Sequence, residues 1–207
     1  MALPPLAEVE DLLAYPGVTA TPEQAALALR LASGAIRNRV KQKISFVAGE
    51  TVILTGGERV LKLPQRPLVQ DADNLLTVVE ILDGNGFEMP AVEGRDFVVV
   101  GSELHRGENW PTSRLMGWPR GRPLGIWADR VRVRYSHGEL EIPDDLVGIC
   151  LDLAAATLAN PRRLRSESAG ATSVTYTVET FGTGSLTADH EKLLRAYKRS
   201  TMSVAPS

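Results

Sequence analysis

The chain of 207 residues carries 23 lysines and arginines against 25 aspartates and glutamates, a formal net charge of −2. This balance argues against a protein that lives by non-specific nucleic-acid binding, because such proteins are normally basic. With 43% apolar and 23% charged residues, the composition is typical of a soluble globular protein with one substantial domain, or a core with a large insertion.

Several targeting features are also missing from the sequence. No apolar run approaches the roughly 20 residues that span a bilayer. The start, Met1-Ala2-Leu3, has no basic segment followed by an apolar core, so no signal peptide is expected. The single cysteine excludes an internal disulfide and fits synthesis in a reducing cytoplasm.

The first predicted element is a short helix over residues 5–14 that ends at Tyr15-Pro16-Gly17. Its apolar residues share one side of the helix: Leu6, Val9, Leu12 and Leu13.

A long helix follows, from Thr21 to about Lys41. Thr21 can cap the helix, Pro22 suits its first position, and Gln24 stands where a capping box needs its reciprocal acceptor. Gly34 in the middle of this helix costs on the order of 1 kcal/mol. We therefore expect a close helix crossing there.

Short β-rich runs alternate with glycine-, proline- and asparagine-rich turns between residues 44 and 135. The runs cover residues 51–54, 59–63, 76–82, 96–100 and 130–135. This pattern predicts a β-rich insertion between two helices of a helical core. Residues 105–128 hold all three tryptophans and are predicted to form an extended loop or hairpin.

The stretch from Arg130 to Tyr176 predicts an alternating strand, a turn, an apolar helix, a polar loop and a second strand. Pro143 is predicted at the first position of the helix, with two aspartates in its first turn. One helix face repeats at three- and four-residue steps: Leu146, Ile149, Cys150, Leu153 and Thr157.

After this helix, which ends at Asn160-Pro161, residues 166–173 are predicted to be polar and flexible, and a strand follows over residues 174–178. A last helix begins near Leu186-Thr187 and ends in Lys198-Arg199. The tail of residues 200–207 has no periodicity and is predicted to be disordered when the protein is alone.

The order of these pieces resembles a known family. The run VRVRYSHGELEIPDDLVGICLDLAAATLANP, followed by RSESAGATSVTY, is similar to the head-to-tail adaptor (connector) proteins of long-tailed double-stranded DNA bacteriophages. There, a strand ending in Tyr-x-His-Gly leads into a Pro-Asp-Asp-Leu helix, a Ser-Glu-Ser segment, a Val-Thr-Tyr strand and a short closing helix. The resemblance extends upstream to residues 60–67 and to Trp118-Pro119-Arg120-Gly121.

The resemblance implies an α+β fold, with a small helical bundle core and a β-rich insertion between the first long helix and the central helix. The expected parts are N-terminal core helices (residues 1–43), the insertion with its tryptophan-containing loop (44–136), a segment that completes the core (137–199) and a flexible tail (200–207).

The resemblance also implies a virion structural protein of the neck, between capsid and tail. It would assemble under the portal protein as a homo-oligomeric ring, of twelve copies by analogy. The ring would extend the channel through which genomic double-stranded DNA passes without sequence readout, and would dock a head-tail stopper or tail-completion protein. No membrane partner, metal or cofactor is implied.

Two sets of side chains are candidates for contacts. Arg130, Arg132 and Arg134 should project from one face of a strand, and Arg162, Arg163 and Arg165 cluster after the central helix. They can form a solvated face with local ion pairs, contact a neighbouring subunit, or line a channel near DNA. With the negative net charge we favour subunit contact over DNA. Trp110, Trp118 and Trp127 are candidate interface anchors, with packing inside the protein as the alternative.

Catalytic chemistry is not indicated by the sequence. His105, His137 and His190 have no metal-ligand spacing, and His137 fits a turn or packing role. Cys150 reads as a small buried hydrophobe. We therefore expect no enzyme, and the second hypothesis is a DNA-binding or genome-packaging accessory protein, which would bind duplex DNA in a steeply salt-dependent way.

Overall fold

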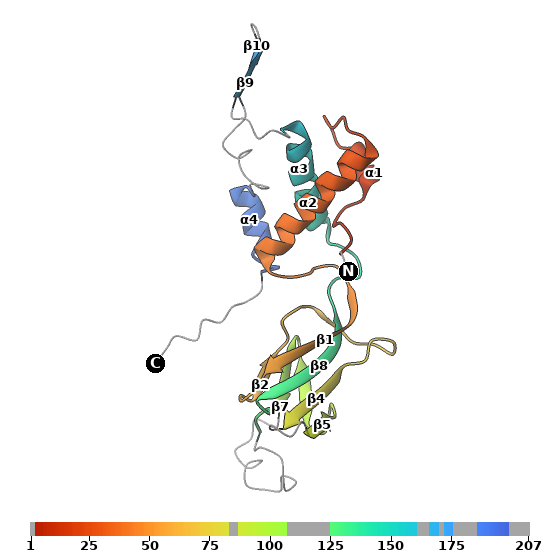
Figure 1. Ribbon diagram of the computed structural model, residues 1–207, viewed down its shortest axis with the longest axis vertical. Coiled ribbons are helices and arrows are strands. Elements are labelled where there is room, and N and C mark those ends of the chain that lie inside the picture. The colour runs from red at the N-terminus through yellow and green to blue at the C-terminus, as the bar shows by residue number, and fades with distance from the viewer. Residues whose placement is uncertain are drawn as a thin grey trace, which may run out of the picture. The chain divides into compact units, whose positions relative to one another are not determined.

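The chain divides into two compact units that are each built around a core of their own. The computed structural model describes residues 3–82, 87–106, 125–160, 166–169, 172–175 and 186–198. One unit, the helical unit, combines Met1–Ser45 with Glu139–Ser207, and the other, the β unit, is Phe46–Gly138. Helices and antiparallel strands occupy separate stretches of the chain (Figure 1), which confirms the predicted α+β class.

The long helix of the helical unit is α2 (Pro22–Val40). The predicted capping box is present: Gln24 N donates to Thr21 Oγ1 at 3.4 Å, and Thr21 N donates to Gln24 Oε1 at 3.1 Å. The helix ends at Val40 because Lys41 adopts a left-handed conformation with φ 59°, which closes the last turn.

The first helix is shorter than the sequence predicts, because α1 covers only Val9–Leu13. Leu6, expected inside this helix, precedes it and is buried. Its backbone N–H donates to Ser33 Oγ on α2 at 2.9 Å instead of to a helical carbonyl. A side chain of α2 therefore replaces the first helical turn that the periodicity predicts.

Helix α3 (Asp144–Ala159) packs against α2 with the predicted face. Leu146, Ile149, Cys150 and Leu153 are buried, and Thr157 at the end of this face is half-buried. Pro143 occupies the N-cap, one residue before the position that the sequence predicts.

The predicted helix crossing at Gly34 is wrong. A Cβ added there would meet no atom within 4 Å, and Gly34 is exposed. The contact between α2 and α3 lies at the preceding residue, where Ser33 Oγ is 3.4 Å from Cys150 Sγ. Gly34 instead faces the surface, where its missing side chain leaves space.

The last helix, α4 (Ala188–Leu194), is capped by Thr187, whose Oγ1 accepts from His190 N at 3.2 Å. The Tyr197 hydroxyl lies beyond the helix end and donates to both carboxylate oxygens of Asp145, at 2.9 and 3.0 Å. This contact ties the end of the chain's described part to the start of α3.

A hairpin stands where the sequence predicts a polar, flexible loop over residues 166–173. Strand β9 (Ser166–Ala169) pairs antiparallel with β10 (Thr172–Thr175). Neighbouring segments can pair through their backbones without alternating apolar residues, so the polar sequence of this hairpin gave no strand signal. The predicted strand over residues 174–178 lies only partly within the described residues, and the tail of residues 200–207 lies outside them.

The described residues of the β unit form a five-stranded and a three-stranded sheet. The first has the order β1-β8-β4-β5, with β3 also paired to β8, and the second has the order β2-β7-β6. Their bounds are β1 (Val47–Thr55), β2 (Val60–Lys62), β3 (Leu68–Val69), β4 (Thr77–Leu82), β5 (Phe87–Ala91), β6 (Phe97–Val100), β7 (Glu103–Arg106) and β8 (Arg130–His137). The five predicted runs match β1, β2, β4, β6 and β8, whereas β3, β5 and β7 were missed.

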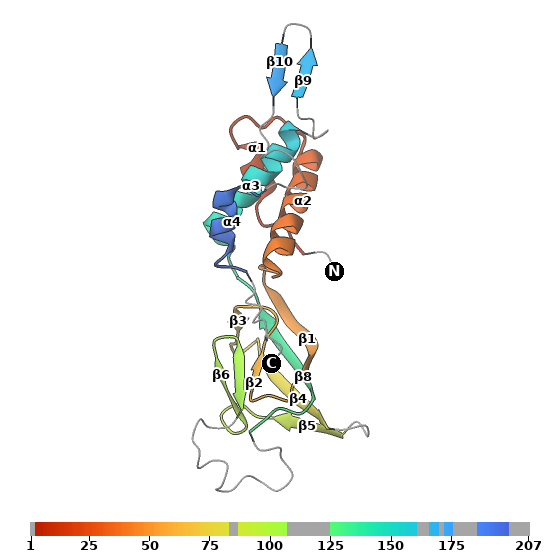
Figure 2. The ribbon, with the colours of Figure 1, turned by 90° about the vertical axis from the view of Figure 1, so that its left-hand side faces the viewer.

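The two sheets share one core, because inward side chains of both belong to a single buried cluster. Figure 2 shows the ribbons of the two sheets next to each other. Val131, Val133 and Tyr135 of β8 are fully buried there. Phe97 of β6 and Leu104 of β7 come from the smaller sheet. The opposite side of the five-stranded sheet is therefore its outer face.

Candidate interaction face

The outer face of the five-stranded sheet carries the predicted arginines of β8. Arg130 and Arg134 are exposed and Arg132 is half-buried, while the residues between them point into the core. This alternation confirms the predicted apolar and arginine faces of the strand. The arginines form a column along β8, which is paired on both sides in the sheet.

The register places small and aliphatic residues on both flanks of this column. Residues that face each other across paired strands share one side of a sheet. On β1 the partners of Arg134, Arg132 and Arg130 are Thr51, Ile53 and Thr55. On β4 they are Thr77, Val79 and Ile81. We call the arginine column and these six residues the open face.

The open face is mostly polar, as is usual for the solvent side of an antiparallel sheet, and its aliphatic members are Ile53, Val79 and Ile81. Ile53, which stands beside Arg132, is 54% exposed. Ile53 and the arginines beside it are therefore candidates for contact with another macromolecule.

The charges of the column are only partly neutralised within the described residues. Arg132 makes a two-pronged ion pair with Glu88 of β5, with nitrogen–oxygen distances of 2.8 and 3.0 Å. Arg130 and Arg134 have no carboxylate partner among the residues that the structure describes. Two cations at the ends of the column are therefore available for carboxylates or phosphates.

Gly49 of β1 makes room for one of these cations. A Cβ at Gly49 would lie 3.1 Å from Arg134 Nε and 3.2 Å from Arg134 Nη2, and Gly49 has φ 58°. The guanidinium therefore lies over bare backbone. A side chain at position 49 would strain the backbone and displace the arginine.

Of the other predicted contact residues, only Trp127 lies within the described residues, and it is buried. Trp127 is 1% exposed, and its indole N–H donates to the Leu104 carbonyl at 3.2 Å. It is a core residue of the β unit, so its predicted role as an exposed anchor is corrected. The remaining candidates lie outside the described residues: Trp110, Trp118, Arg162, Arg163 and Arg165.

A buried ion pair beneath the open face escaped the sequence analysis. Arg106 of β7 is fully buried and contacts Glu80 of β4, which is 1% exposed. The guanidinium carbon also lies 5.1 Å from the centre of the Trp127 ring, and Glu80 Oε1 accepts from Ala128 N at 2.9 Å. Spacing along the strands could have indicated this pair. Glu80 lies two residues after buried Val78 in β4, and Arg106 lies two residues after buried Leu104 in β7, so each faces the same side of its strand as a core residue.

The histidine and cysteine side chains show packing and hydrogen bonding. His137 is fully buried, with Nε2 2.5 Å from Glu50 Oε2. Burial raises the pKa of the Cys150 thiol, which lowers its thiolate fraction. Within the described ranges, no group of three or more histidine, cysteine, aspartate or glutamate side chains could hold a metal ion. No helix there is long and apolar enough to cross a membrane.

Comparison with known proteins yields solved structures only. No family model matches the chain, and no curated protein matches it. One similar structure is the neck of an empty GTA particle computed with C6 symmetry, at 20% identity and a TM-score of 0.49, covering 99% of this chain and 96% of that chain. Another is the neck of a native GTA particle computed with C12 symmetry, with the same identity and TM-score, covering 99% and 92%. Similarity of this degree assigns no function.

Proposed function

We propose that this chain is a structural subunit of a phage neck, a head-to-tail adaptor that forms a ring beneath the portal protein. The observation that carries the proposal is the order of its segments. The pieces that resemble the adaptor family follow one another in the family's order between residues 60 and 176: residues 60–67, 118–121, 131–161 and 165–176.

The residues Tyr135, His137 and Gly138, within the segment 131–161 that resembles the adaptor family, favour a structural role for this protein. Tyr135 and His137 end strand β8 with ring centroids 5.2 Å apart, and both are fully buried. Gly138 follows with φ 95°, a conformation that favours glycine. These residues shape a strand-to-helix connection and present no reactive group to solvent. Such a motif suits a protein that positions surfaces for partners.

The open face supports docking of a protein partner. Its aliphatic residues would be desolvated by a complementary surface, and Arg130 and Arg134 would each take a carboxylate from it. In the proposed neck, this surface meets the portal protein, a head-tail stopper or tail-completion protein, or a neighbouring subunit. Residues 1–43 and 137–199 would form the wall of a twelve-membered ring around the DNA channel, with residues 44–136 as the docking part.

A genome-packaging or DNA-binding accessory protein is the second candidate. The two exposed arginines without carboxylate partners favour it, since phosphates could take the same positions. DNA affinity based on these contacts would fall with salt, with a slope of about −0.9 in log–log form for each phosphate neutralised. Replacing both arginines would then lower the slope by about 2.

The deciding experiment is co-sedimentation of the purified protein with DNA-filled, tailless heads that lack it. Wild type should bind in a saturable way at the portal vertex and restore tail attachment. Arg130→Ala/Arg134→Ala should reduce that attachment. The control Lys192→Ala/Arg195→Ala removes two exposed cations of α4 and its C-cap and should leave it unchanged. No binding to heads, together with salt-sensitive binding to free duplex DNA, would replace the adaptor proposal by the accessory one.

A further inference from the structure

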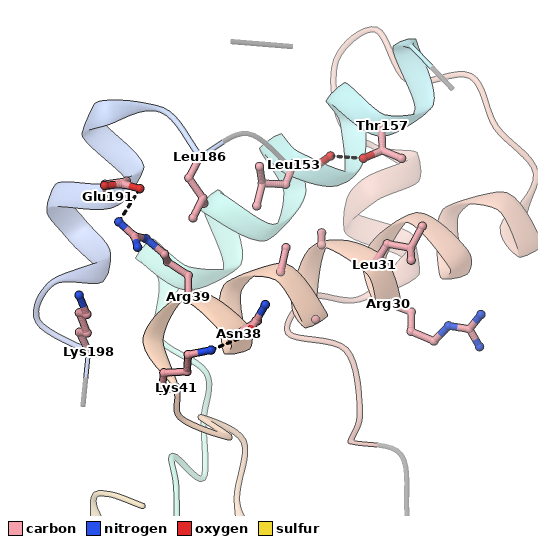
Figure 3. A pocket seen from close by; sticks show the side chains of 13 residues that line it. Arg30, Leu31, Asn38, Arg39, Lys41, Leu153, Thr157, Leu186, Glu191 and Lys198 are labelled. Atoms are coloured by element: carbon pink, nitrogen blue, oxygen red, sulfur yellow. Dashed lines mark hydrogen bonds and ion pairs between the residues drawn. The ribbon is translucent and has the colours of Figure 1, made fainter. Parts of the chain in front are cut away.

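A basic groove runs along the helical unit between α2, α3 and α4 (Figure 3). Its volume is about 920 Å³. Leu31 of α2, Leu153 of α3 and Leu186 before α4 supply apolar lining. Exposed apolar surface continues along α2, because Leu27 is 47% and Leu31 is 52% exposed. The apolar lining of the groove is thus continuous with the exposed leucines on the surface of α2.

The rim of this groove is mainly cationic. Arg30, Arg39, Lys41 and Lys198 line it, against one carboxylate, Glu191. Glu191 is engaged by Arg39 at 2.7 Å, and the Lys41 ammonium reaches the Asn38 side-chain oxygen at 2.7 Å. Within the described ranges, neither Arg30 nor Lys41 has a carboxylate partner. The groove therefore favours an acidic occupant with an apolar edge.

No contact within the described residues of the helical unit requires a glycine at position 34. It lines the groove, it is exposed, and a Cβ there would meet nothing within 4 Å. A glycine inside a helix costs about 1 kcal/mol relative to alanine. Bare backbone at this position allows a partner to approach α2 closely.

An acidic segment with an apolar edge is present on the same unit, at helix α1. Glu8, Glu10 and Asp11 are exposed and have no basic partner within the described ranges. Leu13, at the end of this helix, is 37% exposed. The segment therefore carries three free carboxylates beside an uncovered leucine, which matches the cations and leucines of the groove.

The acidic segment and the groove are made of different residues of the helical unit. The chain before α1 is fixed to α2 through Ser33 and Arg37, which bond to Leu6 and Pro4. The groove is lined by Leu31, Ala35 and Asn38. At 3.6 residues per turn, these two sets lie roughly 150° apart around the helix, and Arg30 and Gly34, which also line the groove, lie between them. Tyr15, which follows α1, and His190 of α4 both contact the Asp152 carboxylate of α3, so the end of α1 and α4 lie near each other there.

We propose that α1 of one copy docks into the basic groove between α2 and α4 of the next copy. Two different, complementary surfaces of one subunit make a head-to-tail contact, and such contacts close into rings when the rotation allows. Charge complementarity fixes the direction of docking, and the leucines supply apolar burial. This inference rests on the proposed ring and names the surfaces that build it.

Cross-linking between two single-cysteine variants tests the contact directly. In a Cys150→Ala background, Leu13→Cys is mixed with Leu31→Cys on a protein of different mass, and a short thiol cross-linker is added. The pair should yield a heterodimer. A matched mixture of Leu13→Cys with Leu140→Cys, where Leu140 is 72% exposed, should not. Equal yields in both mixtures would mean random collision and would overturn the proposal.

Charge exchange separates docking from damage to the fold. Glu10→Lys/Asp11→Lys on the α1 side should lower heterodimer formation by about tenfold, as should Arg30→Glu/Lys41→Glu on the groove side. Mixing the two exchanged partners should restore it, since opposite charges then meet again. An unfolded variant cannot be rescued by its partner, so failure of this restoration would overturn the proposal.

The same variants distinguish this inference from the proposed function. If wild type binds heads and restores tails, and the exchanged variants do so equally well, the docking surfaces are wrong and the adaptor role stands. If the heterodimer forms and is recovered in the charge-exchanged pair, while the wild type does not bind tailless heads, the contact between copies is right and the adaptor role is wrong.

Discussion

The helical unit and the β unit treat charge in their interiors in opposite ways. Within the described residues, the helical unit buries aliphatic side chains and a few neutral polar groups. The β unit buries Glu80, Arg106, Asp96 and His137. Aliphatic packing spreads stability over many replaceable contacts, whereas a buried ion pair concentrates it in two groups that need each other. Single core substitutions should therefore lower the stability of the helical unit in moderate steps, whereas breaking the buried ion pair should lower the stability of the β unit sharply.

Two spectroscopic signals can follow the units separately. All three tryptophans lie within Phe46–Gly138, so tryptophan fluorescence reports on the β unit. The four helices lie in the other unit, so helical circular dichroism reports on that one. The predictions below use both signals.

The largest effect is expected from Glu80→Gln. It leaves the buried Arg106 guanidinium without a counter-charge and should destabilise the β unit by about 3–5 kcal/mol. Urea unfolding followed by fluorescence measures this loss. Glu88→Gln is the matched control, because it breaks the half-exposed pair with Arg132 and should cost at most about 1 kcal/mol. Similar losses for both variants would contradict the contrast.

Leu29→Ala should destabilise the helical unit by about 2–5 kcal/mol, because Leu29 is fully buried and its truncation leaves a cavity. Urea unfolding followed by circular dichroism measures the change. Leu27→Ala, two residues away on the exposed face of α2, should stay within about 0.5 kcal/mol of wild type. A large loss for Leu27→Ala would show that this face is covered in the free protein.

Two glycine substitutions should change stability in opposite directions. In Gly56→Ala the new Cβ would lie 2.0 Å from the Ala128 carbonyl oxygen, so the β unit should lose about 1–3 kcal/mol. Gly34→Ala meets no atom and should stabilise the helical unit by up to about 1 kcal/mol. Thermal unfolding with both signals checks the pair, and destabilisation by Gly34→Ala would point to a hidden contact there.

The smallest effect concerns the Tyr197 hydroxyl. Burial, followed by its hydrogen bond to the Asp145 carboxylate, raises the pKa of Tyr197 from 10.0 to about 12. Because the folded pKa is the higher one, this contribution to stability is complete below pH 10 and is lost as pH rises toward 12. A difference absorbance titration of wild type against Tyr197→Phe measures it. A midpoint near the ordinary tyrosine pKa would show that the contact is absent.

Local signals were readable from the sequence, and long-range ones were not. Thr21 and Gln24 predicted the start of α2 because a capping box needs four residues only. The alternation in β8 predicted both of its faces. Strand β5 was missed because Pro90 interrupts its pattern, although it pairs along the edge of β4.

The candidate sites show the same limit. The arginine column follows from one strand, but its aliphatic flanks depend on β1 and β4, which are far away in the chain. Trp127 was misplaced because its partner Leu104 lies 23 residues away. The groove needs side chains from α2 and α4 together, so no local pattern could reveal it.

The points where the chain leaves and re-enters the helical unit have a consequence for how this protein arose. Glu139 N donates to the Ile44 carbonyl at 2.7 Å, and Ser45 and Glu139 form a parallel bridge. The two ends of the β unit's sequence are thus held together by residues of the helical unit itself. Because lengthening a loop between fixed ends adds little entropy cost, a β unit could be gained, enlarged or exchanged between lineages while the helices stay unchanged.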